Sequence, residues 1–388
     1  MKQEILQQFD GYEDTVKEIE AARKLGPDYA QYKGRVEHWI NRYHPPRLAL
    51  RVSDIIEETA TAKTFRLVST DRVLPPFQAG QYLALSFQFG LIKTGRPYSI
   101  SSSPKNTAYY DVTVRRVPNG LVSNYLLDDI HVGHDFESSG PAGGFVYNPV
   151  FHGRSLVFIA GGSGIAPFMS MIRESLEGGL DRDIILFYGN HSSDDVIFHS
   201  ELVHLASRFK NLRYVPVIEE QGELAPVWPY HKGLITADVI RQTAGDLTGR
   251  MFYMCGPSAM YDFCNRELES MGVSRRRIRQ ESYGPPTHIS RCPGWPETLT
   301  ENTEFRISVN GTKTIPAWAG QSVLTALERG GFYVQSQCRS GECGVCRVRL
   351  LSGTVYQPPS VLLRAADRRF GYIHSCAAYP LEDISVMI

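Results

Sequence analysis

The sequence predicts a multidomain chain that combines α/β with all-β architecture. Three patterns support this: helical periodicity near the N-terminus, period-two alternation of apolar residues from about residue 48, and alternating strand-like and helix-like segments from about residue 155. The chain has 388 residues, of which 42% are hydrophobic and 21% charged, so it is long enough for two or three domains with packed cores.

The first segment, residues 1–46, is predicted to form a helical hairpin. Apolar side chains recur on one face of each helix: Ile5, Phe9, Tyr12, Val16 and Ile19 in the first, and Tyr29, Tyr32, Val36, Trp39 and Tyr43 in the second. Gly26-Pro27 separates the helices, and Pro45-Pro46 ends the second one. We expect the hairpin to buttress the next domain rather than to dock a partner or a second copy of the chain.

The second segment, residues 47–150, is predicted to form a small antiparallel β-barrel, with a sandwich as the alternative. Short β-rich runs such as LALRVSDI, QYLALSFQF and YYDVTVRRV are separated by turns that contain Pro75-Pro76 and Pro118-Asn119-Gly120. Closely spaced strands of this kind are typical of small all-β domains.

The third segment, residues 151–284, is predicted to be a doubly wound parallel α/β domain. Four strand-like runs (SLVFIAGG, DIILFYGN, LRYVPVIEE and RMFYMCGP) alternate with helix-like segments at 169–176, 200–208, 236–242 and 259–271. Residues 285–303 contain four prolines and little periodicity, so we predict a linker there. Residues 304–388 are long enough for one further small domain.

Composition excludes several classes of protein. Lys+Arg and Asp+Glu both number 41, whereas a protein that binds nucleic acid or an anionic membrane would carry a basic excess. The first residues are polar and acidic, unlike a signal or transit peptide. Residues 155–172 are uncharged, but glycines and Pro167 interrupt them, so we predict no membrane span. We therefore expect a soluble, cytoplasmic protein that has no nucleic-acid partner.

Four of the seven cysteines are spaced like the ligands of a metal cluster. Cys338-x4-Cys343-x2-Cys346, followed after 29 residues by Cys376, is the plant-type pattern for a 2Fe–2S cluster. Four thiolates must converge on two irons, and Gly341 and Gly344 allow the loop to wrap around them. A zinc site would need a second pair of closely spaced ligands, which the sequence lacks. A redox-active Cys-x2-Cys pair would leave Cys338 and Cys376 without a role, and buried structural cysteines need no such spacing.

The C-terminal region resembles plant-type ferredoxins beyond its cysteines. Residues 321–329 lie where such domains carry a short helix, and residues 345–353 (VCRVRLLSG) correspond to the strand that leaves the cluster loop. The resemblance covers residues 304–388. It implies a β-grasp-like ferredoxin domain with Cys338, Cys343, Cys346 and Cys376 as the cluster ligands.

Two segments of the predicted barrel carry groups that suit a flavin nucleotide. In Arg96-Pro97-Tyr98-Ser99, the arginine can neutralise a phosphate, the tyrosine can stack on a flavin ring and the serine can reach a ring nitrogen, although a polar turn would also explain the segment. Gly120-Leu121-Val122-Ser123 is a glycine turn that opens a predicted helix, whose free N–H groups can hold a pyrophosphate.

These segments, followed by Gly140-Pro141-Ala142-Gly143-Gly144-Phe145, resemble the ferredoxin-NADP reductase superfamily. The resemblance implies a flavin-binding barrel that contacts the flavin through Arg96, Pro97, Tyr98 and Ser99. It also implies that Gly120, Val122 and Ser123 lie at a diphosphate. This second motif favours FAD over FMN, because FMN has no pyrophosphate.

The same resemblance implies a nicotinamide site in the α/β domain. Gly161-Gly162-Ser163-Gly164-Ile165-Ala166-Pro167 follows a strand and opens a helix, a context that suits phosphate binding but also fits a plain turn. The resemblance places the dinucleotide at Gly162, Gly164, Ile165, Pro167 and Asn190. It places Cys255-Gly256-Pro257 beside the nicotinamide, with Glu281 near the reacting rings and Tyr283 covering the flavin.

The choice between NADH and NADPH depends on charge near the adenine ribose. The loop Asn190-His191-Ser192-Ser193-Asp194-Asp195 contains two carboxylates and no Arg or Lys, which favours NADH. NADPH remains the alternative, because His191 and Ser192 can accept a phosphate and Arg208 or Lys210 could approach in the fold.

The domain order predicts an electron path from NADH through FAD and the cluster to a one-electron protein acceptor. Ser99, Cys255 and Glu281 are the predicted catalytic residues. A ferredoxin domain behind the reductase domains resembles phthalate-dioxygenase-reductase-like proteins and the reductase subunit of phenylacetyl-CoA epoxidase, which implies an oxygenase as the acceptor. The alternatives are a stand-alone NAD(P)H oxidase or flavin/ferric reductase, and an electron-transfer subunit of a larger complex.

Overall fold

The computed structural model describes residues 11–25, 34–43, 45, 47–220, 222, 228–281, 283–286 and 288–388. Met1–Pro46 and Arg47–Ile388 form two separate units. The first unit contains helices α2 (Tyr12–Leu25) and α3 (Arg35–Tyr43), within the segment predicted to be helical. Parts of the predicted apolar stripes lie outside the described residues: Ile5, Phe9, Tyr29, Tyr32 and the side chain of Tyr43. Of the described members, Val36 and Trp39 are exposed, and the buttress role stays a prediction.

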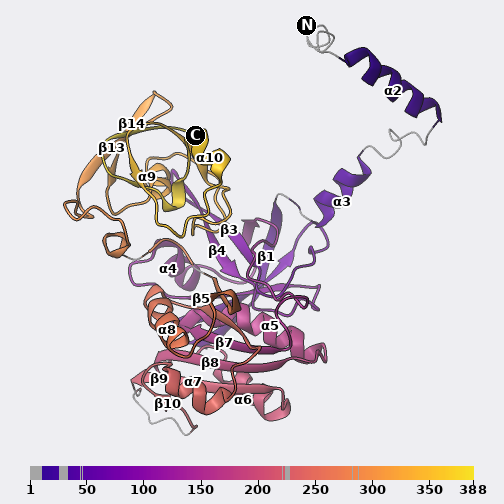
Figure 1. The fold of residues 1–388 in the computed structure, drawn as a ribbon, viewed down its shortest axis with the longest axis vertical. Helices are drawn as coiled ribbons and strands as arrows, with labels where there is room; N and C mark the ends of the chain where they lie inside the picture. Colours follow the sequence, from indigo (N-terminus) through magenta and orange to yellow (C-terminus); the bar gives the residue numbers. More distant parts are fainter. Residues whose placement is uncertain are drawn as a thin grey trace. The chain divides into compact units, whose positions relative to one another are not determined.

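The second unit begins with the predicted antiparallel barrel (Figure 1). Its strands run in the order β4-β3-β6-β1-β2-β5, and a bridge between Ile100 and Val112 joins the end of β4 to β5. The strands are β1 (Leu48–Thr59), β2 (Ala62–Ser69), β3 (Tyr82–Phe89), β4 (Ile92–Ser99), β5 (Tyr110–Arg115) and β6 (Asp135–Ser138). Alternate residues of β1 are buried at its start, and helix α4 (Leu121–Asp128) adds Leu126 and Leu127 to the same core.

The nicotinamide domain has the predicted doubly wound form. Its sheet has the order β10-β9-β8-β7-β11-β12, and all of its pairings are parallel. Helices α5 and α6 pack on one face and α7 and α8 on the other (Figure 1). The strands are β7 (Ser155–Gly161), β8 (Asp183–Ser192), β9 (Leu212–Glu220), β10 (His231–Lys232), β11 (Met251–Cys255) and β12 (Ile278–Glu281). The helices are α5 (Ile165–Glu177), α6 (His199–Arg208), α7 (Ala237–Ala244) and α8 (Ser258–Ser270).

The C-terminal domain is a five-stranded mixed sheet with helix α9 packed against it. Its order is β14-β13-β19-β15-β17, with β13 and β19 parallel and the other pairs antiparallel. The elements are β13 (Glu304–Val309), β14 (Lys313–Trp318), α9 (Val323–Arg329), β15 (Arg347–Ser352), β16 (Val355–Tyr356), α10 (Ala365–Arg369), β17 (Tyr372–His374), β18 (Tyr379–Pro380) and β19 (Ile384–Met387). The helix predicted at 321–329 and the strand predicted at 345–353 are both present, with shorter bounds.

The predicted linker packs against the C-terminal domain. Ile289 and Trp295 are buried in a cluster with Tyr356 and Tyr379, and the Trp295 indole donates a hydrogen bond to the Leu299 carbonyl. The domain boundaries 47–150, 151–284, 285–303 and 304–388 stay predictions. Among the described residues, no helix is both long and apolar enough to cross a membrane.

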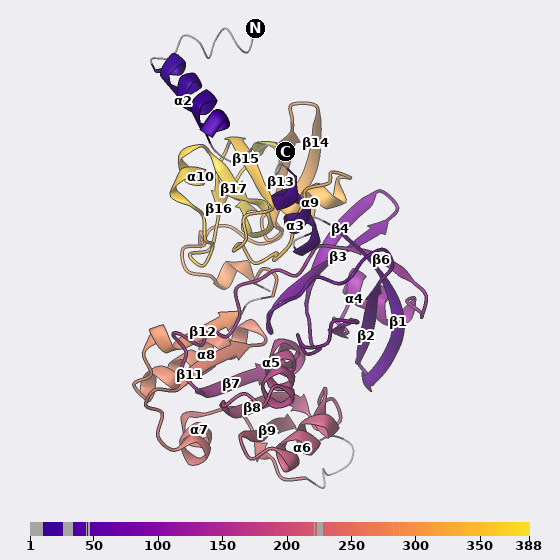
Figure 2. The ribbon, with the colours of Figure 1, turned by 90° about the vertical axis from the view of Figure 1, so that its right-hand side faces the viewer.

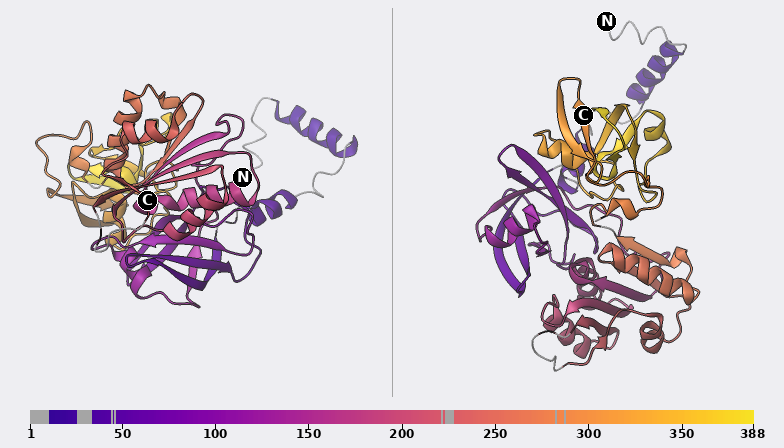
Figure 3. Two further views of the ribbon diagram at one scale, coloured as in Figure 1. Left: turned by 90° about the horizontal axis from the view of Figure 1, so that it is seen from below. Right: turned by 90° about the vertical axis from the view of Figure 1, so that its left-hand side faces the viewer.

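The barrel and the C-terminal domain meet at β4 and α9, which lie side by side in Figure 2. The right-hand view of Figure 3 shows the two domains, purple and yellow, next to each other. Glu328 and Arg339 form a buried ion pair there, with N–O distances of 2.7 and 2.9 Å. Both side chains also bond to β4: the Thr94 hydroxyl donates to Glu328 at 3.0 Å, and Arg339 donates to the Gly95 carbonyl at 3.2 Å. The ion pair therefore connects the two domains.

Replacing Arg339 by Ala should destabilise the C-terminal domain. The Glu328 carboxylate would stay buried without its cation, which costs about 3–5 kcal/mol when a buried pair is broken on one side. Urea unfolding of the loaded protein, followed by loss of cluster absorbance, measures the effect. Arg306→Ala, at an exposed position of β13, is the control. Equal unfolding midpoints for the two variants would contradict the prediction.

Candidate functional site

The three predicted catalytic residues and Tyr283 come together where the barrel meets the nicotinamide domain. Ser99 ends β4, Cys255 ends β11, Glu281 ends β12 and Tyr283 follows two residues later. The Ser99 and Tyr283 hydroxyl oxygens are 2.5 Å apart, and the Tyr283 hydroxyl donates to Glu281 Oε2 at 3.1 Å. The Cys255 thiol also lies within hydrogen-bonding reach of the Tyr283 hydroxyl. The structure thus joins these residues in one polar network.

Burial keeps this network in its neutral form. The pKa of Glu281 is raised to about 8, chiefly by burial and to a smaller extent by the nearby Glu342 carboxylate, while the hydrogen bond from Tyr283 opposes the shift. Burial also raises the pKa of the Cys255 thiol well above its usual value. At neutral pH the site therefore holds protons beside the place where a hydride would arrive.

The predicted flavin motif lies on β4 next to the contact with the C-terminal domain. Tyr82, Leu83, Ala84 and Leu85 of β3 pair with Ser99, Tyr98, Pro97 and Arg96 respectively. Burial, together with the neighbouring Arg339 guanidinium, lowers the pKa of Arg96 to about 10, and the Glu328 carboxylate opposes the shift. Arg339 holds both oxygens of Glu328, so two guanidinium groups lie near one carboxylate. The remaining positive charge fits the phosphate of a flavin nucleotide.

The predicted diphosphate motif begins helix α4. Gly120 is the N-cap residue and makes no side-chain cap bond. The Ser123 hydroxyl accepts a hydrogen bond from the Val117 N–H at 3.1 Å and lies 3.4 Å from the Gly120 carbonyl. Ser123 is thus engaged within the turn, and the Val122 side chain is buried in the barrel core. The free N–H groups of the first helical turn are the remaining donors for a diphosphate.

A cavity of about 750 Å³ opens at the carboxyl edge of the parallel sheet. It lies where the chain direction across the sheet reverses, between β7 and β11, which is the usual ligand position in doubly wound folds. Of the predicted dinucleotide residues, Gly162, Gly164, Asn190, Gly256 and Pro257 line it, as does Tyr283. Cys255, Ile165 and Pro167 do not, and Ile165 and Pro167 are buried in helix α5.

The loop after β7 and the loop after β11 contact each other. A Cβ atom on Gly164 would lie 2.1 Å from the Cys255 carbonyl oxygen, so only glycine fits at this position. The buried Asn190 amide approaches the Tyr188 hydroxyl, yet neither its nitrogen nor its oxygen has a hydrogen-bond partner among the described residues. A ligand with donors and acceptors, such as a dinucleotide, would satisfy the amide.

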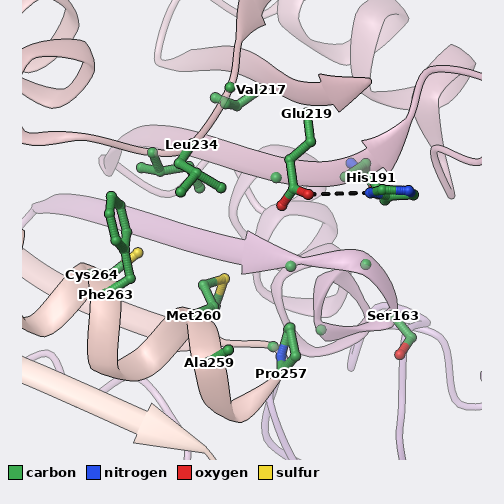
Figure 4. Close-up of a pocket in the computed structure, with 18 of the residues that line it drawn as sticks. Ser163, His191, Val217, Glu219, Leu234, Pro257, Ala259, Met260, Phe263 and Cys264 are labelled. Atoms are coloured by element: carbon green, nitrogen blue, oxygen red, sulfur yellow. Dashed lines mark hydrogen bonds and ion pairs between the residues drawn. The ribbon is translucent and has the colours of Figure 1, made fainter. Parts of the chain in front are cut away.

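Several lining residues were not predicted from the sequence (Figure 4). Arg115 reaches the cavity from β5 of the barrel; it bonds to the Asp195 carbonyl at 2.6 Å, and its Nη1 lies 2.5 Å from where a Gly162 Cβ would be. Leu234 and Phe263 lie together on one side of the cavity, where their apolar surfaces suit an adenine ring. The rule that parallel strands carry ligand groups at their carboxyl ends could have indicated Glu219 on β9.

Among the described residues that line the cavity, Glu219 is acidic and Arg115 and Arg266 are basic. The Glu219 carboxylate favours a ribose hydroxyl over a phosphate. Glu219 points into the cavity and lies 3.2 Å from His191 Nδ1 (Figure 4). The hydrogen bond from His191 to Glu219 raises the histidine pKa, and Glu220 adds to this effect. The alternative phosphate ligands Ser192, Arg208 and Lys210 do not line the cavity, whereas Arg266 does.

The four predicted cluster ligands converge in the C-terminal domain. Cys338, Cys343 and Cys346 lie on the loop between α9 and β15, and Cys376 follows β17. The Cys338 thiol lies within hydrogen-bonding reach of Cys343 and Cys376, and Cys346 lies within reach of Cys376. Four sulfur donors at one point fit a 2Fe–2S cluster.

The cluster loop is held by buried hydrogen bonds. His374 Nδ1 lies 2.8 Å from the Gly341 carbonyl, and the Ser375 hydroxyl donates to the Cys346 carbonyl at 2.7 Å. Gly341 has a φ of 83°, which favours glycine. Cys343 is the exposed ligand, whereas the other three are buried.

Tyr82, which the sequence did not single out, lies opposite Ser99 in the β3–β4 pair. Burial raises its pKa, and the charges of Cys338, Cys343, Glu281 and Glu342 raise it further. Strand β4 also lies against the segment that leads to Cys338, because a Cβ atom on Gly95 would be 3.4 Å from the Ser336 carbonyl oxygen. The cluster loop and the Ser99–Tyr283 network therefore lie against the same pair of strands.

Comparison with known proteins assigns three domain families to the chain. Residues 48–147 match the oxidoreductase FAD-binding domain, residues 158–266 the oxidoreductase NAD-binding domain and residues 307–381 the 2Fe-2S iron-sulfur cluster binding domain.

Individual relatives agree with these domains. The chain is 28% identical over 361 residues to the glycine betaine monooxygenase reductase subunit of Pseudomonas aeruginosa, which covers 90% of this chain and 96% of that protein. It is 31% identical to the ferredoxin–NAD(P)(+) reductase component of naphthalene 1,2-dioxygenase/salicylate 5-hydroxylase systems of a Ralstonia species, over 62% of this chain and 71% of that one. Phthalate dioxygenase reductase shares the fold, with a TM-score of 0.64 at 23% identity, over 88% of this chain and 98% of that one.

Flavin reduction should slow as the pH rises through about 8. Glu281 is protonated below this pH and a carboxylate above it, and the anion opposes the arrival of a hydride. Anaerobic stopped-flow reduction by NADH between about pH 7 and 9 measures this. Glu281→Gln should remove the pH-dependent fall, while Glu269→Gln, at an exposed position on α8, should keep it. An unchanged fall in Glu281→Gln would contradict the assignment.

Glu219→Gln should lower the preference for NADH over NADPH by about tenfold, because a neutral amide no longer repels a 2′-phosphate. The ratio of kcat/KM for the two donors is the measurement. The matched control is Glu220→Gln, since Glu220 is adjacent but does not line the cavity. Equal ratios for the unaltered chain and Glu219→Gln would refute this role.

Proposed function

The chain belongs to the family of reductases that join FAD-binding, NAD-binding and 2Fe–2S domains in one polypeptide, and we propose that its acceptor is the oxygenase component of a mono- or dioxygenase system. The protein passes electrons from NADH through FAD to the 2Fe–2S cluster and on to a protein acceptor. The relatives named above support the proposal, because both are reductase components of oxygenase systems.

One observation supports the internal electron path: the β3–β4 pair contacts both sites. Ser99, which ends β4, is hydrogen-bonded to Tyr283, and Gly95 of the same strand lies against Ser336, two residues before Cys338. The two redox sites are thus neighbours in one chain, and electrons need no second protein to pass between them. A flavin reductase for small acceptors would not need a cluster in this position.

The bound groups supply the redox chemistry: FAD accepts a hydride from NADH, and the cluster carries electrons singly. The residues of the chain bind and orient them. We propose that Arg96 neutralises a flavin phosphate and that Tyr98 and Pro97 bind beside the ring. The first turn of α4, from Gly120 through Val122 and Ser123, would hold the diphosphate.

On the donor side, we propose that Gly162, Gly164, Asn190, Gly256 and Pro257 hold the dinucleotide. Ile165 and Pro167 would support that loop from the buried side of α5. Ser99, Cys255 and Glu281 would keep a proton within reach of the flavin, with Tyr283 connecting them. Tyr283 lines the dinucleotide cavity, so it would have to move for the nicotinamide to reach the flavin.

We also propose that the protein works in the cytoplasm. None of its seven cysteines forms a disulfide, and thiolate ligands persist best in a reducing compartment.

Cys343→Ser should block electron transfer from the cluster to the acceptor while leaving flavin reduction by NADH intact. Anaerobic NADH should still bleach the flavin at the unaltered rate, while reduction of a one-electron protein acceptor such as cytochrome b5 should fall by at least about 100-fold. Cys292→Ser, outside the four ligands, is the control. Full-rate reduction of cytochrome b5 by Cys343→Ser would exclude a path through the cluster. A flavin that stays oxidised with excess NADH would instead favour a subunit that is fed by another protein.

A further inference from the structure

A groove of about 230 Å³ lies on the C-terminal domain beside Cys343, the exposed cluster ligand. All of its lining residues come from this domain, and none comes from the barrel or the nicotinamide domain. They include Arg347, Leu362 and Arg364. The groove therefore lies wholly on the C-terminal domain and gives a partner access to Cys343.

The chain around this groove is strongly basic. Residues 340–372 contain five arginines (Arg347, Arg349, Arg364, Arg368 and Arg369), which we call the arginine face, and only two acidic residues. One of these, Glu342, is exposed and lines the groove. The other, Asp367, is buried and accepts hydrogen bonds from Arg347 at 2.7 Å and Arg364 at 2.8 Å. These two arginine side chains stay 39% and 65% exposed. The Asp367 carboxylate thus lies inside, and the five arginines outnumber the one exposed carboxylate.

The fold places the arginine face on neighbouring elements. In the β15–β17 pair, Arg347 lies opposite His374 and Arg349 opposite Tyr372. Arg347 and Arg349 are exposed and the intervening Val348 is buried, so both arginines point outward. Helix α10, which carries the exposed Arg368 and Arg369, lies next to β17 (Figure 2).

Exposed apolar side chains accompany these charges. Leu362 at the groove is 64% exposed, and Phe370 at the end of α10 is 62% exposed. Tyr372, opposite Arg349, is also exposed. Arginines next to large exposed apolar and aromatic side chains are typical of protein–protein interfaces.

We propose that the arginine face docks a protein acceptor whose surface is acidic around its electron-accepting group. The inference rests on the proposed function, since it assigns the docking site of the acceptor named there. The chain as a whole is neutral, with 41 basic and 41 acidic residues, so the arginine face is a local excess of positive charge beside the exposed cysteine. Local charge of this kind steers one partner to one site, whereas polyanions such as nucleic acids need a wider basic surface.

Charge reversal with two acceptors of opposite charge tests the proposal. The holoenzyme with Arg368→Glu and Arg369→Glu is compared with the unaltered chain, using acidic cytochrome b5 and basic cytochrome c as probes. We expect kcat/KM for cytochrome b5 to fall about 10- to 100-fold at low ionic strength, and the difference to shrink at high salt. The value for cytochrome c should stay constant or rise.

Two further variants test whether the effect depends on the arginine face rather than on helix α10 or on net charge alone. Arg349→Glu, on β15 rather than α10, should have the same sign of effect, so a local defect in α10 would not explain both. Arg275→Glu with Arg276→Glu makes the same change in net charge at the amino end of β12, away from the groove, and should change kcat/KM less than about twofold. An equal loss in this control, or no loss in the arginine-face variants, would overturn the proposal.

The remaining outcomes separate this inference from the proposed function. Anaerobic reduction of the flavin and cluster by NADH, without any acceptor, tests the function alone and should be the same in all variants. If NADH reduces the flavin and the cluster but charge reversal leaves the rate of cytochrome b5 reduction unchanged, the proposed docking site is refuted and the proposed function is not. Binding to phosphatidylserine vesicles that is lost in the Arg368→Glu, Arg369→Glu variant, with unchanged cytochrome b5 rates, would assign the face to a membrane surface and refute a protein partner.

Discussion

The buried ion pair between Glu328 and Arg339 is the constraint on which the rest of the arrangement depends. Electron transfer within one chain requires that the flavin site and the cluster stay in contact. The pair fixes this contact, because it bonds to Thr94 and Gly95 of β4 directly before Arg96 of the flavin motif. Arg339 also follows the ligand Cys338 in sequence. This ion pair therefore links Arg96, where we propose that a flavin phosphate binds, to the interdomain contact and the cluster loop.

Burial has opposite electrostatic consequences at the Ser99–Tyr283 network and at the β4–α9 contact. At the hydride site it keeps Glu281, Tyr283 and Cys255 neutral, which suits a reaction that brings negative charge into a closed space. At the β4–α9 contact two guanidinium groups lie near one carboxylate, which leaves a positive charge for an anionic phosphate. Low-dielectric surroundings thus keep the Ser99–Tyr283 network protonated in one place, and in the other they hold a guanidinium group that has no carboxylate of its own.

The sequence predicts the parts of the site that lie close together along the chain. The cysteine spacing predicts the ligand set because three of the four ligands share one loop, and the glycine turn after β7 is local in the same way. Tyr82, Arg115 and Glu219 were not predicted, because each acts through residues that only the fold brings near. Arg115 is an example: it belongs to the barrel but lines a cavity of the nicotinamide domain. Conversely, Ser123 fits its motif, yet its hydroxyl is occupied by the backbone of its own turn.

The direction of electron flow follows from what each redox site exposes. The donor cavity has glycines and apolar side chains in its lining, together with Glu219, Arg115 and Arg266, which suits a small polar donor such as a dinucleotide. Of the four cluster cysteines, Cys343 is exposed, and arginines lie beside it at the surface. A small two-electron donor thus fits the first site, and a protein can approach the second. Because the two sites lie against the same pair of strands, the fold itself separates hydride chemistry from single-electron delivery, and the acceptor does not need to enter the flavin site.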